Sequence, residues 1–208
     1  MKENELWIAI ETGGSDGGVS FGLFAGGEAR FGRIKARADD LVRELGQLLK
    51  ANGLALAAVS GVAVSTGPGS LTGLRIGMAA ARGLARAIGC AIYEMSLPEA
   101  VYYSEKLSAP CRLAIVSGGF LYIRDFVIGE RGNGTGTSAE LIKLPVQEID
   151  LKEVFKTNVQ VYLVDPGPGS VLQSGNLLKE LPFEVLNGER NFGKDLIQSA
   201  RRLASDND

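Results

Sequence analysis

Residues 66–77 read Thr66-Gly-Pro-Gly-Ser-Leu-Thr-Gly-Leu-Arg-Ile-Gly77, a loop rich in Gly and Pro that leads into a helical pattern. Gly69, Gly73 and Gly77 are four residues apart and two alanines continue the spacing, so a helix would carry them as one stripe without bulk. Each Gly inside a helix costs about 1 kcal/mol relative to Ala. The stripe therefore predicts that another backbone approaches this helix closely, either from a strand of the same lobe or from the helix of a partner.

The loop before this helix offers the backbone amides of a helix N-terminus, which is a natural anion site, but it matches neither common phosphate motif. The Gly-Lys-Ser/Thr ending of a P-loop is missing, and Thr72 stands where the dinucleotide-binding fingerprint has its third Gly. Gly67 and Gly69 are kept as candidate nucleotide contacts, beside the packing role of the segment.

A second candidate nucleotide site is the turn after the first predicted strand, Glu11-Thr12-Gly13. In its place along the chain it resembles the Asp-x-Gly-Thr phosphate loop of actin-like and sugar-kinase-like ATPases, with Glu11 in place of the Asp. Glu11, Thr12 and Gly13 are therefore candidates for holding a nucleotide, and Glu11 for holding its metal ion. The sequence offers no identifiable second catalytic acid.

Hydrophobic periodicity and turn residues divide the chain into two halves with the same order, βββαβαβα. In the first half we expect strands at 6–11, 19–24, 29–35, 60–65 and 90–95, and helices at 39–52, 70–88 and 96–106. Asp39 or Asp40 is expected to cap the first of these helices, and Ser96 with Glu99 matches a capping box at the start of the third. In the second half we expect strands at 112–116, 121–128, 139–144, 159–164 and 183–186, and helices at 150–156, 170–181 and 193–204. Gly-Pro-Gly-Ser occurs at 67–70 and again at 167–170, after the fourth strand of each half. The pattern predicts a duplicated α/β fold with two lobes, residues 1–107 and 108–208.

Composition narrows the chemistry that this chain can perform. It has 208 residues, a net charge of −2 and no histidine, which excludes a Ser-His-Asp triad, a Cys-His pair and any His-based metal site. Its two cysteines are not in a CxxC motif, so no zinc or redox site is expected. The near-neutral charge gives no global attraction to nucleic acid. The polar N-terminus resembles no signal peptide and no apolar run is long enough to span a membrane, so we expect a cytoplasmic protein.

The segment from Ala55 to Ala100 resembles the TsaB (YeaZ) family, the paralogues of the TsaD/Kae-type proteins. The resemblance lies in Ser65-Thr-Gly-Pro-Gly-Ser-Leu-Thr-Gly-Leu-Arg-Ile-Gly77, in Ala81-Arg-Gly-Leu-Ala85 and in Ser96-Leu97. It implies an actin/Hsp70-like (ASKHA) fold of two lobes, in agreement with the duplicated order of elements.

The resemblance also implies a function, that of a non-catalytic subunit that pairs with a TsaD-like protein. Together with a TsaE-like ATPase, the pair would support threonylcarbamoyl transfer to adenosine in tRNAs that read ANN codons, and this chain would meet tRNA only indirectly. No catalytic residue, metal or cofactor of its own is implied, although ATP or ADP could lie at the contact between partners. The pairing surface is implied to lie on the helices at 39–52 and 70–88. Its candidate residues here are Leu41, Leu45, Ser70, Leu71, Thr72, Gly73, Leu74, Arg75, Gly77, Met78 and Arg82.

The sequence departs from the family pattern in two places and leaves two other functions open. Ser117-Gly118-Gly119 and Tyr122-Ile123-Arg124 stand where many relatives carry Asp-Ala-Arg and Glu-Val-Tyr, and Glu11 replaces the usual Asp. One alternative is a free-standing ATPase or phosphotransferase of the actin-like class, which Glu11 and the two Gly-Pro-Gly loops would favour. The other is a repurposed homodimer, which the departures at 117–124 would favour.

Overall fold

The structure is a computed structural model that describes residues 4–13, 18–25, 28–37, 40–117, 119–127, 140–146, 154, 156–164, 184–186 and 192–206. The chain forms two compact units. Unit 1 comprises Met1–Glu105 together with Asn191–Asp208, and unit 2 comprises Lys106–Arg190.

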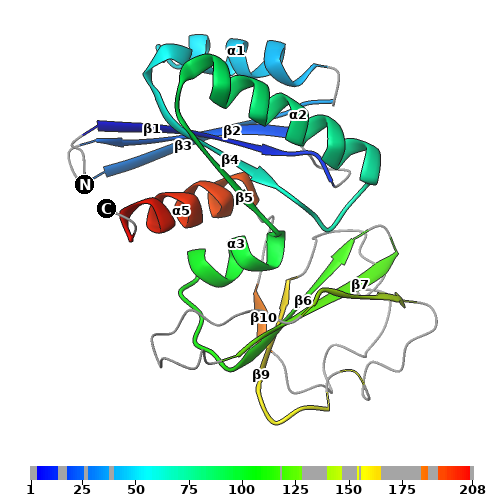
Figure 1. Cartoon of the computed structure of the whole chain (residues 1–208). Coiled ribbons are helices and arrows are strands. Elements are labelled where there is room, and N and C mark those ends of the chain that lie inside the picture. The colour runs from blue at the N-terminus through cyan, green and yellow to red at the C-terminus, as the bar shows by residue number, and fades with distance from the viewer. Residues whose placement is uncertain are drawn as a thin grey trace. The chain divides into compact units, whose positions relative to one another are not determined.

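Unit 1 is built around a five-stranded mixed sheet in the order β3-β2-β1-β4-β5 (Figure 1). Its elements are β1 (Asn4–Glu11), β2 (Gly18–Ala25), β3 (Glu28–Lys35), α1 (Leu41–Ala51), a short 3₁₀ helix (Leu56–Ala58), β4 (Val59–Ser65), α2 (Leu71–Ile88), β5 (Ala91–Met95), α3 (Leu97–Ser104) and α5 (Phe192–Ser205). β1, β2 and β3 pair antiparallel, whereas β4 is parallel to both β1 and β5. The helices between parallel strands are the crossover connections that such pairing requires.

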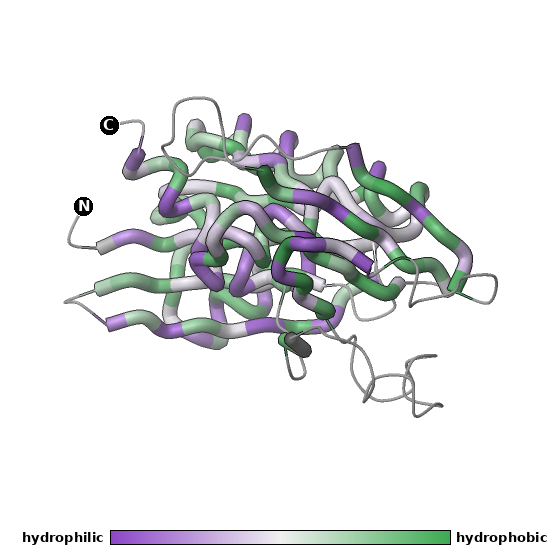
Figure 2. The backbone as a smooth tube through the Cα atoms, turned by 90° about the horizontal axis from the view of Figure 1, so that it is seen from below, coloured by the Kyte–Doolittle hydropathy of each residue, from purple (hydrophilic) through white to green (hydrophobic). Residues whose placement is uncertain are grey.

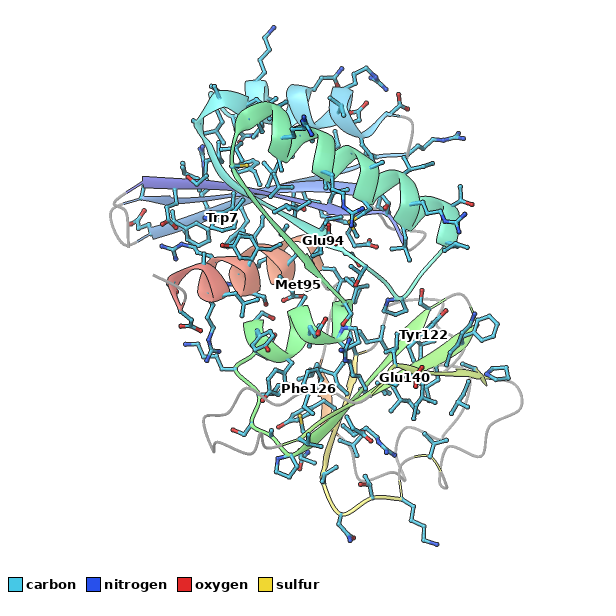
Figure 3. All side chains as sticks on the ribbon, in the orientation of Figure 1. Trp7, Glu94, Met95, Tyr122, Phe126 and Glu140 are labelled. Carbon is cyan, nitrogen blue, oxygen red and sulfur yellow. The ribbon has the colours of Figure 1, made fainter. Side chains whose placement is uncertain are left out.

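The central strands of the sheet in unit 1 are buried on both faces, and alternate residues of β1 point to the two faces. Ile8 and Ile10 point into a core shared with α1 and α2, whereas Trp7 and Ala9 point into a second core that contains α5. Figure 1 shows α1 and α2 on one side of this sheet and α5 on the other, and Figure 3 shows the Trp7 side chain on the α5 side. A strand covered on both faces needs apolar residues at every position, which explains the continuous run in β1.

The last helix, α5, corrects the predicted division into residues 1–107 and 108–208, because it belongs to unit 1. Its buried residues Leu196 and Ile197 fill the second core of the sheet. The Arg201 guanidinium also lies 4.0 Å from the centroid of the Phe24 ring, and its Nε donates to Glu5 at 2.6 Å. The chain therefore returns to its first lobe at the C-terminal end.

Helix ends in unit 1 follow local capping rules, with one exception. Ser70 caps α2 by accepting from the backbone N–H of Gly73 at 3.4 Å, and Gly89 closes the same helix at a φ of 79°. The predicted capping box of α3 is confirmed: the Ser96 N–H donates to Glu99 at 2.8 Å, and the Ser96 hydroxyl accepts from the Glu99 N–H. Asp40 precedes α1 as predicted, but its carboxylate pairs with the Arg43 side chain and caps no backbone amide.

Unit 2 repeats the sheet of unit 1 with the order β10-β9-β6-β7-β8. Its strands are β6 (Cys111–Ser117), β7 (Phe120–Phe126), β8 (Ile142–Pro145), β9 (Gln160–Val164) and β10 (Glu184–Leu186). β6, β7 and β8 are antiparallel, and β9 is parallel to both β6 and β10, so each strand corresponds to one of β1 to β5. The predicted duplication is confirmed at the level of strand order and direction.

Several predicted features of the second half cannot be compared with the structure. The helix at 170–181, the second Gly-Pro-Gly-Ser loop at 167–170 and most of the helix at 150–156 lie outside the described residues. Figure 2 shows hydrophobic and hydrophilic residues interspersed along the described parts of the chain, and no helix among these residues is both long and apolar enough to cross a membrane.

Candidate functional site

The Gly stripe of α2 packs against the turn that follows β1 in the same unit. A Cβ atom added at Gly73 would overlap the carbonyl oxygen of Thr12, and one added at Gly77 would overlap the Thr12 hydroxyl. The approach is closed by hydrogen bonds: the Thr12 hydroxyl donates to the Gly73 carbonyl at 2.7 Å, and the Ser70 N–H donates to the Gly13 carbonyl at 2.7 Å. Of the two predicted partners of the stripe, the neighbouring strand of the same lobe is therefore the one observed.

Gly69 and Gly13 form the tightest part of this contact. A Cβ atom on Gly69 would overlap the backbone of Gly13, and one on Gly13 would lie 2.9 Å from the carbonyl oxygen of Pro68. Only glycine allows the two loops to meet backbone to backbone. We call this contact of Thr12 and Gly13 with Gly69, Gly73 and Gly77 the loop junction.

The candidate nucleotide residues all take part in hydrogen bonds or close contacts within unit 1. Glu11 is buried, 7% exposed, and accepts from the Gly13 N–H at 2.7 Å. The Gly67 N–H donates to the Ser65 hydroxyl at 3.0 Å, and its carbonyl accepts from the Leu97 N–H at 2.6 Å. Of the candidate nucleotide residues, Thr12, Gly13 and Gly69 belong to the loop junction, whereas Glu11 and Gly67 bond to residues next to it.

The structure divides the eleven candidate pairing residues into an inward and an outward group. Six of them face inward. The two leucines of α1 are 2% and 1% exposed, Met78 packs on the same core, and Leu74 touches Gly13 and Gly67. The six are Leu41, Leu45, Gly73, Leu74, Gly77 and Met78. Leu41, Leu45 and Gly77 are buried, which corrects the expectation that these three contact a partner directly, whereas Gly73, Leu74 and Met78 are half-buried. The periodic leucines that make α1 amphipathic are the residues that hold it on its own sheet.

The remaining five candidates, Ser70, Leu71, Thr72, Arg75 and Arg82, are exposed on the other side of α2. Leu71 is 63% exposed, and two further large apolar side chains that sequence reasoning missed, Val42 on α1 and Ile76 on α2, are 53% and 38% exposed. We define the outer α1–α2 face by its exposed residues Val42 and Gly46 on α1 and Leu71, Thr72, Arg75, Ile76, Ala79, Arg82, Gly83, Arg86 and Ala87 on α2. Val42 and Ile76 lie on different helices and form no repeat of their own, so no spacing pattern marks them as exposed.

Charges on the outer α1–α2 face are unevenly paired. Arg82 holds the carboxylate of Glu94, on β5, in two hydrogen bonds of 2.7 and 3.0 Å, and this lowers the pKa of Glu94 (Figure 3 shows Glu94 beside α2). Arg43, next to the face in the first turn of α1, pairs with Asp40 and Glu44. In contrast, neither Arg75 nor Arg86 forms an ion pair with any residue that the structure describes.

The part of unit 2 that departs from the family pattern forms the β6–β7 hairpin. Ser117 and Phe120 are its last paired residues, Tyr122 is 8% exposed, and Gly118 lies outside the described residues. Arg112 bridges to Asp125 at 2.7 and 2.8 Å across these strands. Desolvation, with the nearby Asp125 charge, raises the pKa of the Cys111 thiol to about 11. A buried thiol with so high a pKa is suited to packing and unsuited to nucleophilic chemistry.

The described residues contain no group of three or more Cys, Asp or Glu side chains that could hold a metal ion. Glu11 is the residue that the sequence suggested as the ligand of a phosphate-bound metal ion. Its carboxylate instead accepts a hydrogen bond from the Gly13 N–H in the turn that follows β1. The geometry of unit 1 thus provides a closed loop junction on the inside of α2 and an exposed apolar and basic face on the outside.

Two sheets of identical strand order, with helices on both faces of the first, define an actin-like (ASKHA) α/β protein. Known structures with the same fold include YeaZ from Pseudomonas aeruginosa, which is 20% identical with a TM-score of 0.61 and aligns over 97% of this chain and 93% of its own. A protein described as similar to peptidase YEAZ from Pseudomonas aeruginosa is 21% identical over the same shares, with a TM-score of 0.63. The ethanolamine utilization protein EutJ from Carboxydothermus hydrogenoformans is 11% identical, with a TM-score of 0.57 over 96% of this chain and 90% of its own.

The family described as TsaD, tRNA N6-adenosine threonylcarbamoyltransferase, matches residues 34–127 of this chain. That segment runs from the end of β3 to the end of β7 and includes the loop before α2 and the outer α1–α2 face. No curated protein sequence matches the chain. The YeaZ structures confirm the expected fold over nearly the whole chain, and residues 34–127 match the TsaD family.

Proposed function

We propose that this chain is a non-catalytic, TsaB-type subunit that pairs with a TsaD-like transferase through its outer α1–α2 face. In this role it acts in the cytoplasm and supports threonylcarbamoyl transfer to adenosine in tRNAs that read ANN codons. A TsaE-like ATPase binds to the complex of the two proteins, and this chain contacts tRNA only indirectly, through its TsaD-like partner. The observation that carries the proposal is the exposure of Val42, Leu71 and Ile76 on two helices within the segment that matches the TsaD family.

The exposed apolar residues support a protein partner. A single exposed leucine or valine is ordinary, but large apolar side chains exposed on both α1 and α2 are of the kind that association sites use. Exposed positions of the two helices also carry small residues, namely Gly46 on α1 and Ala79 and Gly83 on α2. A Cβ atom added at Gly46 or Gly83 would meet nothing within 4 Å. Small residues on exposed helix surfaces allow the helix of a partner to approach closely.

The loop junction supports a non-catalytic role. In an actin-like ATPase the turn after the first strand must be open to a phosphate, whereas here its carbonyl and hydroxyl groups bond to α2. The chain also has no histidine to act as a general base or metal ligand. The reactive groups of the complex would therefore come from the TsaD-like partner, and any ATP or ADP would lie at the contact between partners.

Two other functions are kept because a specific observation favours each. Glu11, a buried carboxylate at the end of β1, favours a free-standing ATPase or phosphotransferase. The outer α1–α2 face could equally pair with a second copy of the chain, which favours a homodimeric interaction protein. Calorimetric titration with ATP and Mg²⁺ tests the first, and we expect no binding heat from the chain alone.

The proposed function is tested by deleting the gene and measuring threonylcarbamoyladenosine in total tRNA by mass spectrometry. We expect the modified nucleoside to disappear and to return when the wild-type chain is supplied from a plasmid. An unchanged amount of modified nucleoside in the deletion strain, with no second copy of the gene present, would contradict the proposal and favour the homodimeric alternative.

A further inference from the structure

β3 is the longest edge strand among the strands that the structure describes. The two sheets end at β3 and β5 in unit 1 and at β8 and β10 in unit 2, and these strands are 8, 5, 4 and 3 residues long. A short edge strand, or one that ends in Pro as β8 does at Pro145, offers little for another chain to pair with. β3 contains no Pro, and it pairs with β2 in unbroken register from Glu28 to Lys35, so no bulge interrupts it.

The outer side of β3 is accessible along the whole strand. None of its eight residues is buried, whereas Leu6 to Glu11 of the central strand β1 all are. In an antiparallel pair, every second residue turns its N–H and C=O away from the partner strand. Among the described residues, only β2 pairs with β3, and no other backbone hydrogen bond reaches residues 28–35. The outward groups of β3 therefore form a template for one more strand.

Cations predominate along this edge. Residues 28–37 contain Arg30, Arg33, Lys35 and Arg37 but a single acid, Glu28. Two β3 strands from two copies of the chain would bring this excess of positive charge together, which is unfavourable for directly opposed side chains. A strand with Asp or Glu opposite the cations would be favoured by the same interaction. The charges of β3 thus oppose pairing between copies and favour an acidic strand.

The side chains of β3 alternate between the two faces of the sheet. Ile34 packs on the core that contains α1 and α2, and Phe31 packs on the core that contains α5. The period of two residues places Arg30 on the face of Ile34, and Arg33 and Lys35 on the face of Phe31. Each face therefore presents an apolar position beside at least one cation to a strand that pairs with β3.

We propose that the outer edge of β3 binds an acidic, extended segment of another protein, which adds to the sheet of unit 1 as a further antiparallel strand. Antiparallel addition continues the alternation of β1, β2 and β3. The segment places carboxylates opposite Arg30, Arg33 and Lys35, and β-branched side chains opposite Phe31 and Ile34. This edge is separate from the outer α1–α2 face, so failure of the inference would leave the proposed function untouched.

The pattern of β3 specifies the segment residue by residue. An antiparallel strand read from its N-terminal end meets the positions of β3 from 35 down to 30. Gly32 has no side chain of its own at this edge, and a Cβ there would overlap the ring of Phe21, so an aromatic residue opposite it covers the gap. The matching hexapeptide is Glu-Val-Glu-Tyr-Val-Glu.

The same features favour a peptide over a nucleic acid. Arg30 and the pair Arg33 and Lys35 lie on opposite faces of the sheet, so they do not form one continuous row for a phosphate backbone. The outward carbonyl groups of β3 need hydrogen-bond donors, and phosphate oxygens only accept. A peptide backbone supplies both a donor and an acceptor at every second residue.

The first test measures binding of the hexapeptide, acetylated, amidated and labelled with fluorescein, by fluorescence anisotropy. We expect the wild-type chain to bind it at least tenfold more tightly than Lys-Val-Lys-Tyr-Val-Lys, and Arg30→Glu/Lys35→Glu to reverse that preference. Both substitutions are at exposed positions. Lys106→Glu/Lys156→Glu, at exposed positions of unit 2, changes the net charge equally and should alter binding less than twofold.

The second test separates strand pairing from attraction between charges and needs no protein variant. Two versions of the acidic hexapeptide are N-methylated on alternate backbone amides, at the second and fourth residues or at the third and fifth. Only one of these sets faces β3 in a paired strand, because backbone groups alternate in direction. We expect one methylated peptide to bind at least tenfold more weakly than the unmodified peptide, and the other to bind within about threefold of it.

Three results would overturn the inference. The first is no binding of the acidic peptide to the wild-type chain at about 1 mM peptide, the range of very weak complexes. The second is equal binding of the two methylated peptides, or equal binding of the acidic peptide to the wild-type chain and to Arg30→Glu/Lys35→Glu. The third is tighter binding of the RNA hexauridylate than of the acidic peptide, lost in the same double variant, which would assign this edge to nucleic acid.

Discussion

Replacing Gly73 by Ala tests whether α2 is held by the loop junction. The added Cβ would lie closer than 3.0 Å to the Thr12 carbonyl oxygen, and because that atom belongs to the backbone it cannot rotate away. The end of β1 or the helix must therefore shift. Overpacking of this kind costs about 1–3 kcal/mol and the lost Thr12–Gly73 hydrogen bond about 1 kcal/mol, whereas the gain in helix propensity returns about 1 kcal/mol. We expect Gly73→Ala to destabilise the protein by about 2 kcal/mol.

Gly83 on the same helix provides a matched control. A Cβ at Gly83 would meet nothing within 4 Å, so Gly83→Ala should stabilise the protein by about 0.5–1 kcal/mol through helix propensity alone. Both variants can be followed by urea unfolding at 25 °C through the fluorescence of Trp7, which is the single tryptophan of the chain and lies buried in β1. If Gly73→Ala were as stable as Gly83→Ala, the close approach of Thr12 to α2 would be refuted.

Three further predictions follow from the same contacts. Gly77→Ala should destabilise the protein by about 1–2 kcal/mol, because the added Cβ meets the Thr12 hydroxyl. In a double-mutant cycle, Gly77→Ala should cost less stability when Thr12 is already replaced by Ala. Additive effects of the two substitutions would count against the contact. Arg201→Ala should cost about 2 kcal/mol, since it removes a 2.6 Å ion pair with the largely buried Glu5 carboxylate, and limited proteolysis should then release α5 first. With a pKa of about 11, only about 0.1% of Cys111 is thiolate at pH 8. Iodoacetamide should therefore label Cys111 about a hundredfold more slowly in the native protein than in urea. Equal labelling rates would show that this thiol is not buried.

Much of the fold could be predicted from sequence because each lobe repeats a pattern that local chemistry determines. Runs of apolar residues gave the strands of unit 1, and Ser96 with Glu99 gave the start of α3. The lobe to which α5 belongs could not be predicted in the same way. Its amphipathic pattern predicts that one side of the helix is buried, but does not predict which of the two similar sheets covers that side. The contacts of Arg201 with Glu5 and Phe24, near the other end of the chain, place α5 on the sheet of unit 1.

The site was predicted in part, for a related reason. Spacing identified Gly73 and Gly77 as positions of close approach, but a stripe of small residues does not identify what approaches it. Leu41 and Leu45 were placed on the pairing surface because they lie on the right helix, although their periodicity marks the side that faces the sheet. Ile76 was missed because a single apolar residue among Arg, Ala and Gly does not stand out until the buried side of α2 is known.

The central claim is that the outer α1–α2 face, and not the loop junction, is where this chain meets a TsaD-like protein. The most direct measurement is the dissociation constant of that complex for wild type, Ile76→Asp and Ile142→Asp, by sedimentation or calorimetry. Ile76 and Ile142 are similarly exposed, at 38% and 46%, so a charge at either position leaves the fold of its unit intact. We expect Ile76→Asp to weaken binding at least tenfold, about 1.4 kcal/mol, and Ile142→Asp to leave it within twofold. A complex that tolerates Ile76→Asp, or no complex of the wild-type proteins at micromolar concentration, would contradict the account.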